Sequence, residues 1–175
     1  YGYGVTVTAL QLAQAYAVIA SGGIQRPISF TKVTGPVPGK RILDEKIARA
    51  IIPMMETVVT QEGTALRAAV PGYRIAGKTG TAHKAQGGGY ASDAYMSLFV
   101  GMAPASAPRV VTAIIIDNPR QGGYYGGLAA APVFSRMMSD TLRLMNIEPD
   151  RSAERLAEQH RFPHPSTWAR PGREG

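Results

Sequence analysis

GYRIAGKTGTAHK, residues 72–84, is the stretch of sequence from which the fold of this chain is best inferred. Its bulky side chains alternate over Tyr73, Arg74 and Ile75, and alternation with a period of two residues is typical of a β-strand. The same run then reaches a lysine, two threonines and a glycine before it enters a glycine-rich loop. We therefore expect a strand over residues 74–81 that carries these polar groups.

The polar end of this strand suits recognition of a carboxylate. Thr79 and Thr81 are two residues apart, so on a strand their hydroxyls project the same way and form a pair of donors. Gly77 and Gly80 leave room for the backbone of a ligand to lie along the strand edge. Lys78 adds positive potential. From these four positions alone, an ordinary edge strand followed by a turn remains an equal alternative.

Residues 72–79 also fit the phosphate-binding loop pattern G-x-x-x-x-G-K-[ST], and the apolar run 110–117 ends in Asp117, where such proteins hold magnesium. That loop requires a helix that begins at the lysine, because the amides of the helix N-terminus bind the phosphates. The eleven residues after Lys78 read TGTAHKAQGGG and contain four glycines, which do not sustain a helix. Nucleotide binding is therefore a disfavoured alternative.

A second pattern, S-x-x-K, occurs at Ser29 and Lys32, and in some enzymes this pair supplies a nucleophilic serine and its base. The surrounding residues 26–33 are rich in β-branched side chains and predict a strand that ends in the GPVPG turn. On a strand the two side chains would point to opposite faces. We therefore do not assign Ser29 as a nucleophile.

The spacing of apolar and capping residues along the chain predicts an α+β fold with an antiparallel sheet flanked by helices. Thr8 and Gln11 form a capping box before a helical apolar pattern, and Asp44 caps a second helix. The expected elements are helices over 9–20, 44–59 and from Ala131 to 145 with Pro132 in the first turn, a helical turn near Leu66, and strands over 74–81, 94–102 and 109–117. Residues 150–175 are polar, and we expect them to form a mobile tail after a domain over 1–149.

Composition narrows the function classes. The 175 residues are 45% hydrophobic, which fits one globular domain. The chain contains no cysteine, so disulfides and thiolate metal sites are excluded. No pattern in the sequence predicts a metal or a cofactor. The net charge of +7 resides entirely in residues 1–147 and favours an anionic partner. Because the basic residues are scattered singly, we do not expect nucleic acid to be that partner.

Long segments of the chain resemble the class B penicillin-binding proteins, most closely the septum-specific penicillin-binding protein 3 family. The resemblance is carried by YGYGVTVTALQLAQAYAVIASGG, GYRIAGKTGTAHK, SLFVGMAPAS, GGYYGGLAAAPVFSRMM and LRLMNIEPD. It implies the penicillin-binding transpeptidase fold, related to serine β-lactamases, of which this chain would be the C-terminal portion. It also implies an anchor in the inner membrane upstream of the chain, with the catalytic domain facing the periplasm.

For the strand, the resemblance implies that Lys78, Thr79 and Gly80 form the family's third motif. The hydroxyls of Thr79 and Thr81 would hold the terminal carboxylate of a D-Ala-D-Ala stem peptide or of a β-lactam antibiotic. The backbone N–H of Thr81 would supply half of an oxyanion hole, where the loss of one donor typically costs about 10²- to 10³-fold in rate.

Other residues are assigned on the same resemblance. Tyr95, Tyr124 and Tyr125 would form an aromatic wall around the ligand side chain, although packing in the core or in a loop explains them equally well. His83 lies where a basic side chain would face an anionic substituent.

For the whole protein, the resemblance implies a peptidoglycan D,D-transpeptidase that crosslinks stem peptides at the division septum through an acyl-serine intermediate. The nucleophilic serine and the S-x-N motif would lie upstream, because S-x-N does not occur in this chain. Expected partners are membrane proteins of cell division, including a septal glycan polymerase. The alternative is a non-catalytic division scaffold with the same fold.

Overall fold

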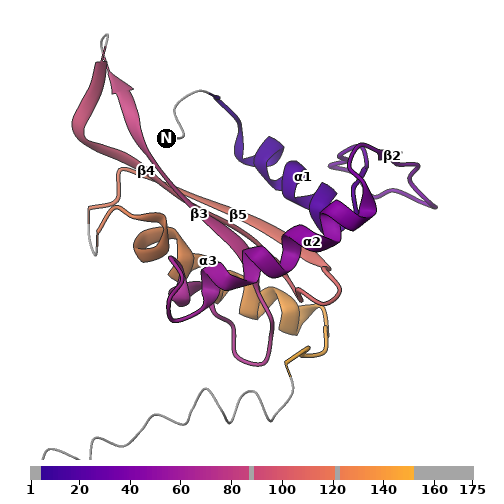
Figure 1. Cartoon of the computed structure of the whole chain (residues 1–175). Coiled ribbons are helices and arrows are strands. Elements are labelled where there is room, and N and C mark those ends of the chain that lie inside the picture. Colours follow the sequence, from indigo (N-terminus) through magenta and orange to yellow (C-terminus); the bar gives the residue numbers. More distant parts are fainter. Residues whose placement is uncertain (1–4, 87–88, 121–122, 152–175) are drawn as a thin grey trace, which may run out of the picture.

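The computed structural model describes residues 5–86, 89–120 and 123–151. The helices and strands form an α+β arrangement, shown in Figure 1, in which three consecutive strands build the central sheet. In chain order they are α1 Ala9–Ala20, β1 Ile24–Gln25, β2 Lys40–Arg41, α2 Glu45–Glu56, the 3₁₀ helices η1 Thr57–Val59 and η2 Leu66–Ala68, β3 Ala76–Gln86, β4 Gly89–Ala103, β5 Val110–Asp117 and α3 Gly126–Leu144. Among these helices, none is long and apolar enough to cross a lipid bilayer.

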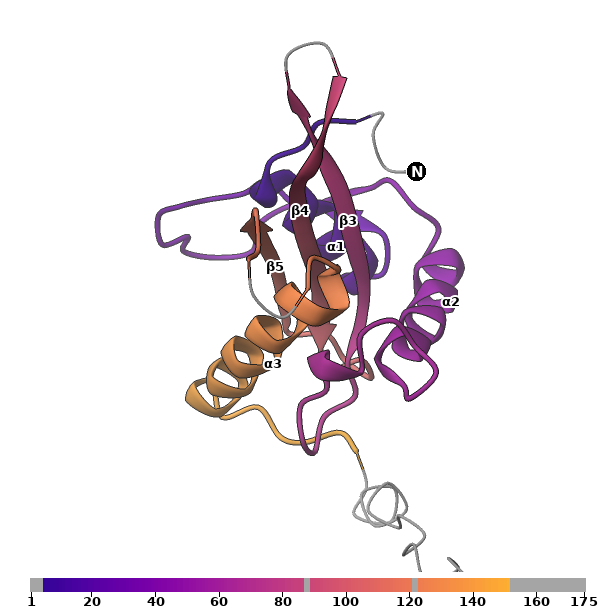
Figure 2. The same ribbon diagram turned by 90° about the vertical axis from the view of Figure 1, so that its left-hand side faces the viewer.

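The central sheet has the order β3-β4-β5 and is antiparallel throughout, which confirms the predicted sheet. Thr81 lies opposite Ser97 on β4, and Phe99 on β4 lies opposite both Thr79 on β3 and Ile114 on β5. Within the described residues β3 pairs with β4 alone, so its other edge is open. Figure 2 shows α3 in front of the sheet and α1 behind it.

The core follows the alternation of side chains along β4. Phe99 faces α3, where its ring packs edge-on against Phe134 at a centroid distance of 4.7 Å. Met102 faces the opposite side and packs against Ala76 of β3 and Met55 of α2. The two phenylalanines and the two methionines of these contacts are each at least nine-tenths buried. The two apolar layers hold β3 and β4 in place beneath the polar residues that follow Gly77.

The helix starts form as the sequence predicts. Thr8 and Gln11 complete the capping box, with Thr8 Oγ1 accepting the Gln11 N–H at 3.2 Å and Gln11 Oε1 accepting the Thr8 N–H at 2.9 Å. Asp44 Oδ1 accepts the Lys46 N–H at 2.7 Å at the start of α2. These bonds satisfy amide groups that have no partner inside the helices.

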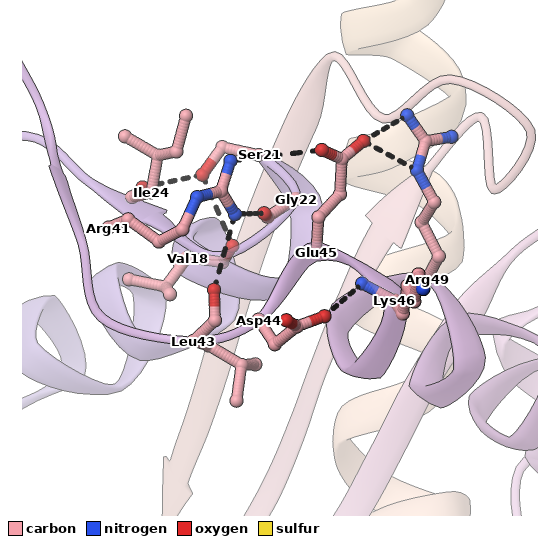
Figure 3. A network of polar contacts seen from close by, with 10 residues as sticks. All are labelled: Val18, Ser21, Gly22, Ile24, Arg41, Leu43, Asp44, Glu45, Lys46 and Arg49. Atoms are coloured by element: carbon pink, nitrogen blue, oxygen red, sulfur yellow. Dashed lines mark hydrogen bonds and ion pairs between the residues drawn. The ribbon is translucent and has the colours of Figure 1, made fainter.

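An arginine joins the end of α1 to the start of α2, as Figure 3 shows. Arg41 Nη1 donates to the carbonyl of Gly22 at 2.7 Å and to that of Leu43 at 3.3 Å. Glu45 in the first turn of α2 accepts from Arg49 at 2.6 Å and lies 3.8 Å from Arg41. The two helices on the same side of the sheet are thereby connected through one polar network.

The predicted strand over residues 26–33 is wrong. Only Ile24–Gln25 pairs, with Lys40–Arg41, and the residues that follow are irregular and exposed. Ser29 Oγ accepts the Thr31 N–H at 3.2 Å and donates to the Thr31 carbonyl at 2.7 Å. This local turn competes with strand pairing, and Pro27 has no N–H to offer a ladder.

The last helix begins five residues earlier than predicted, at Gly126, so Pro132 lies in its interior and not in its first turn. Two glycines at a helix start are poor helix formers, and the sequence pattern therefore favours the later start. The structure shows the reason for them. A Cβ at Gly126 would lie 2.6 Å from the Gly80 carbonyl oxygen, and one at Gly127 would overlap the Thr64 carbonyl oxygen.

The folded part extends past residue 149. Asp150 Oδ1 accepts the Arg74 N–H at 2.6 Å, and its Oδ2 accepts from Ser106 N at 3.1 Å and Ser106 Oγ at 2.7 Å. The Arg151 N–H donates to the Gly72 carbonyl at 3.1 Å. Asp150 and Arg151 therefore hold the residues that lead into β3. The rest of the predicted tail, 152–175, lies outside the described residues.

Candidate functional site

The residues of the predicted third motif, from Lys78 to Thr81, lie on β3, whose outer edge is open within the described residues. Thr79 and Thr81 point to the face of the sheet that α3 covers, as their spacing predicts, while Lys78 begins on the other face. The lysine side chain is exposed and folds back, so that its Nζ donates to the Thr79 carbonyl at 2.9 Å and lies 3.4 Å from Thr79 Oγ1. Within the described part of the chain, no carboxylate forms an ion pair with Lys78.

The hydroxyl of Thr79 has a second partner that the sequence does not reveal. Thr64 Oγ1 lies 3.0 Å from Thr79 Oγ1, although the two residues are fifteen positions apart. Thr64 belongs to the short link between η1 and η2, and no motif marks it. Its contact arises because α3 and β3 both pack against this link.

The hydroxyl of Thr81 is fixed by the start of α3. The N–H of Gly126, the first residue of that helix, donates to Thr81 Oγ1 at 3.2 Å. A helix N-terminus carries partial positive charge, so α3 adds to the positive potential of Lys78 at the two hydroxyls. Gly126 is also a residue that sequence reasoning missed, and the GG pair at 126–127 is the signal that would have found it.

The two glycines of the strand have different roles. Gly77 is buried beneath Phe99, and a Cβ there would lie 2.9 Å from the Val100 carbonyl oxygen and 3.0 Å from Phe99 Cε1. The expectation that Gly77 makes room for a ligand is therefore wrong, because it makes room for the core. The atoms nearest to a Cβ at Gly80 would be those of the Leu98 side chain, at an ordinary 3.4 Å or more.

The structure places His83 in one row with the three tyrosines that were predicted to form an aromatic wall. His83 and Tyr95 are paired across β3 and β4 with ring centroids 4.4 Å apart, and Tyr95 stacks on Tyr124 at 3.9 Å with an interplanar angle of 13°. Tyr124 then contacts Tyr125 at 4.5 Å. A hydrogen bond of 3.2 Å between the two phenol oxygens raises the pKa of Tyr125 above its ordinary value.

A buried serine forms a hydrogen bond to the backbone of this aromatic row. Ser97 is fully buried, pairs with Thr81 across the sheet, and donates its hydroxyl to the carbonyl of Tyr124. Among the residues that the structure describes, Ser97 is the only polar or charged residue that is buried. Tyr125 at the end of the row is 56% exposed, so this ring is not a core residue.

The phosphate-loop interpretation is wrong. Lys78 lies inside β3, Ala76–Gln86, so no helix begins at this lysine as the phosphate-binding loop requires. Asp117, which would hold magnesium in that interpretation, instead forms an ion pair with Lys84, with Oδ1 and Nζ 2.7 Å apart. No group of three or more metal-ligating side chains occurs among the residues that the structure describes.

Comparison with known proteins shows the family to which the chain belongs. Residues 1–139 match the sequence model of the penicillin-binding protein transpeptidase domain. The chain belongs to the penicillin-binding protein transpeptidase family. Its relatives include the peptidoglycan D,D-transpeptidase FtsI of Escherichia coli K12, with 51% identity over 86% of this chain and 26% of the relative. The probable peptidoglycan D,D-transpeptidase PbpC of Pseudomonas aeruginosa is 46% identical over 94% of this chain and 29% of the relative.

A solved structure shows that the fold is the penicillin-binding transpeptidase fold. The apo transpeptidase domain of penicillin-binding protein 3 from Burkholderia pseudomallei matches with a TM-score of 0.81 and 45% identity, over 87% of this chain and 46% of the other. The chain thus spans about a quarter of its curated relatives and just under half of that solved chain.

Within this transpeptidase family member, the S-x-x-K pattern at Ser29 remains unassigned. Both residues are exposed and lie in the irregular segment before β2, and Ser29 Oγ is engaged by Thr31. Because no strand forms there, the two side chains are not placed on opposite faces of a strand. Ser29 is instead held by hydrogen bonds within its own loop.

Proposed function

We propose that this chain supplies the carboxylate-binding side of the active site of a peptidoglycan D,D-transpeptidase. The observation that carries the proposal is the pair of hydroxyls, Thr79 and Thr81, on the open edge of β3 beside Lys78 and the N-terminus of α3. The similarity to FtsI supports the same reaction. The substrate would be the D-Ala-D-Ala end of a stem peptide, and β-lactams would bind in its place.

The backbone of Thr81 suits the role of an oxyanion donor. Lys78 Nζ reaches the Thr79 carbonyl, which indicates that this carbonyl faces the open edge of β3. In an antiparallel pair, residues two apart direct their N–H and C=O groups to the same edge. The Thr81 N–H would therefore face the same side, where it would stabilise negative charge that develops on a substrate carbonyl.

In the reaction that we propose, a serine upstream of this chain attacks the carbonyl of the penultimate D-Ala. The peptide bond to the terminal D-Ala breaks and that residue leaves, and the acyl group then passes to an amine of a neighbouring stem peptide. Lys78 and the two threonines hold the departing carboxylate, and Tyr95, Tyr124, Tyr125 and His83 line the far end of the site.

We also propose that the protein acts at the division septum, anchored in the inner membrane with this domain in the periplasm. A septal glycan polymerase and other membrane proteins of cell division would be its partners. The similarity to FtsI supports this placement. Co-purification of a glycan polymerase with the full-length protein from membranes tests the partner, and its absence after mild extraction would contradict it.

Covalent labelling with a fluorescent penicillin tests the activity. We expect the full-length protein that carries this chain to be labelled, and Lys78→Ala to weaken the labelling, because the ammonium contributes the charge beside both hydroxyls. Lys40→Ala, on β2 and outside the site, is the matched control and should label normally.

The outcomes separate the alternatives. Normal labelling of Lys78→Ala would contradict the role given to Lys78. Absence of labelling in the folded wild-type protein would instead favour the non-catalytic scaffold, and the upstream sequence would then lack S-x-x-K and S-x-N.

A further inference from the structure

We infer that Thr64 is a positioning residue that orients the hydroxyl of Thr79 toward a ligand carboxylate. The inference rests on the proposed function and names a further residue of the same site. It is carried by the 3.0 Å contact between Thr64 Oγ1 and Thr79 Oγ1, which joins the link between η1 and η2 to β3.

The backbone around Thr64 is held by the fold. The N–H of the next residue, Ala65, donates to the Val58 carbonyl at 2.8 Å, and Ala65 is 1% exposed. The Thr64 carbonyl lies against Gly127 at the start of α3, where no side chain would fit. The backbone of Thr64 is therefore held by a buried neighbour and by a helix, in a position that does not depend on the ligand.

The count of donors and lone pairs shows what this contact does. The Thr79 hydroxyl has one hydrogen and two lone pairs. Lys78 is a donor only, so its Nζ, 3.4 Å away, occupies a lone pair. An ionised carboxylate can only accept hydrogen bonds, so Thr79 must donate its single hydroxyl hydrogen to the ligand.

Only one arrangement of the threonine pair is compatible with that bond. If Thr79 donates to Thr64, it has no hydrogen left for the carboxylate. If Thr64 donates to Thr79, both lone pairs are engaged and the hydrogen is free to point at the ligand. A hydroxyl that accepts from donors also becomes a stronger donor, because hydrogen bonds in a chain polarise one another. Thr64 thus serves the carboxylate through Thr79 and does not touch it.

A double-mutant cycle in the full-length protein tests this. The second-order rate constant for acylation by a fluorescent penicillin would be measured for the wild type, Thr64→Val, Thr64→Ser, Thr79→Val and the Thr64→Val/Thr79→Val pair. We expect Thr64→Val to lower the rate constant about 3- to 10-fold, the size of one net hydrogen bond. Thr64→Ser, which keeps the hydroxyl, should restore it.

The decisive result is the effect of Thr64→Val in the Thr79→Val background. If Thr64 acts through the Thr79 hydroxyl, the second substitution adds nothing once that hydroxyl is gone. An equal loss in both backgrounds would overturn the inference, as would a wild-type rate constant in Thr64→Val.

Two controls keep the test independent of stability and of the proposed function. Thr60→Val removes a hydroxyl from the same link that donates only to the Thr57 carbonyl, at 2.8 Å, and should not change acylation. Unfolding temperatures identify a general loss of structure, and Thr64→Ala replaces Thr64→Val if the valine lowers it. If the wild-type protein is not acylated, the proposed function fails. If only the Thr64 variants behave as wild type, the inference alone fails.

Discussion

The N–H of Gly126 and the Oγ1 of Thr81 form a hydrogen bond of 3.2 Å, which joins the first residue of α3 to the strand that carries the site. The bond engages one lone pair of the Thr81 hydroxyl and leaves its hydrogen available. The Oγ1 of Thr79 makes a corresponding contact of 3.0 Å with the Oγ1 of Thr64. Each of the two threonines is therefore oriented by a different neighbouring segment.

Gly126→Ala should displace the start of α3 from the sheet. The new Cβ would lie 2.6 Å from the Gly80 carbonyl oxygen and closer still to that of Leu98, both of which are backbone atoms that cannot turn away. Overpacking of this kind typically costs about 1–3 kcal/mol. Denaturant unfolding measures the loss, and the acylation rate reports the displaced Thr81 contact.

Met137→Ala is the control for this substitution, since Met137 lies on the same helix and is 50% exposed. Its free energy of unfolding should change by no more than about 0.5 kcal/mol. A Gly126→Ala variant as stable as this control would contradict the close packing of α3 on Gly80.

Ser97→Ala should weaken the support of the aromatic row. The substitution removes the donor to the Tyr124 carbonyl, and an unsatisfied buried group costs about 1–3 kcal/mol. We expect lower stability in denaturant unfolding and a slower acylation by penicillins with bulky side chains. Unchanged discrimination between bulky and small side chains would show that Tyr124 does not depend on Ser97.

Asp150→Ala should loosen the entry to β3. The carboxylate accepts the N–H groups of Arg74 and Ser106, and its removal leaves both without this partner. We expect a loss of about 1–3 kcal/mol in thermal or denaturant unfolding. Glu148→Ala, two residues earlier and exposed, is the matched control and should unfold as the wild type does.

The strands and helix caps were predictable from the sequence because their signals are local. The apolar run over residues 110–117 and the capping box at Thr8 each involve residues a few positions apart. The alternation over Tyr73, Arg74 and Ile75 placed the start of the next strand too early, because β3 begins at Ala76. The segment 26–33 was not predictable in the same way. Its β-branched residues fit a strand, but the turn at Ser29 competes with pairing, and the structure leaves it exposed.

The site was predictable only in part, for a related reason. The polar residues of β3 can be found from their motif, Lys78 to Thr81, in the sequence. Thr64 and Ser97 belong to no motif, and they reach the site only through the packing of the fold. Gly77 was misassigned because a glycine next to a motif resembles one that admits a ligand. Only the position of Phe99 shows that Gly77 is required by the core.

The oriented threonine pair also depends on distant parts of the chain. The contact to Thr79 spans 15 positions and the contact to Thr81 spans 45, so neither forms until the intervening loops have closed. Formation of β3 and β4 alone would yield the motif without its oriented hydroxyls. Capacity to bind a carboxylate would therefore appear late in folding, and acylation by penicillin would report on the complete native structure of this domain.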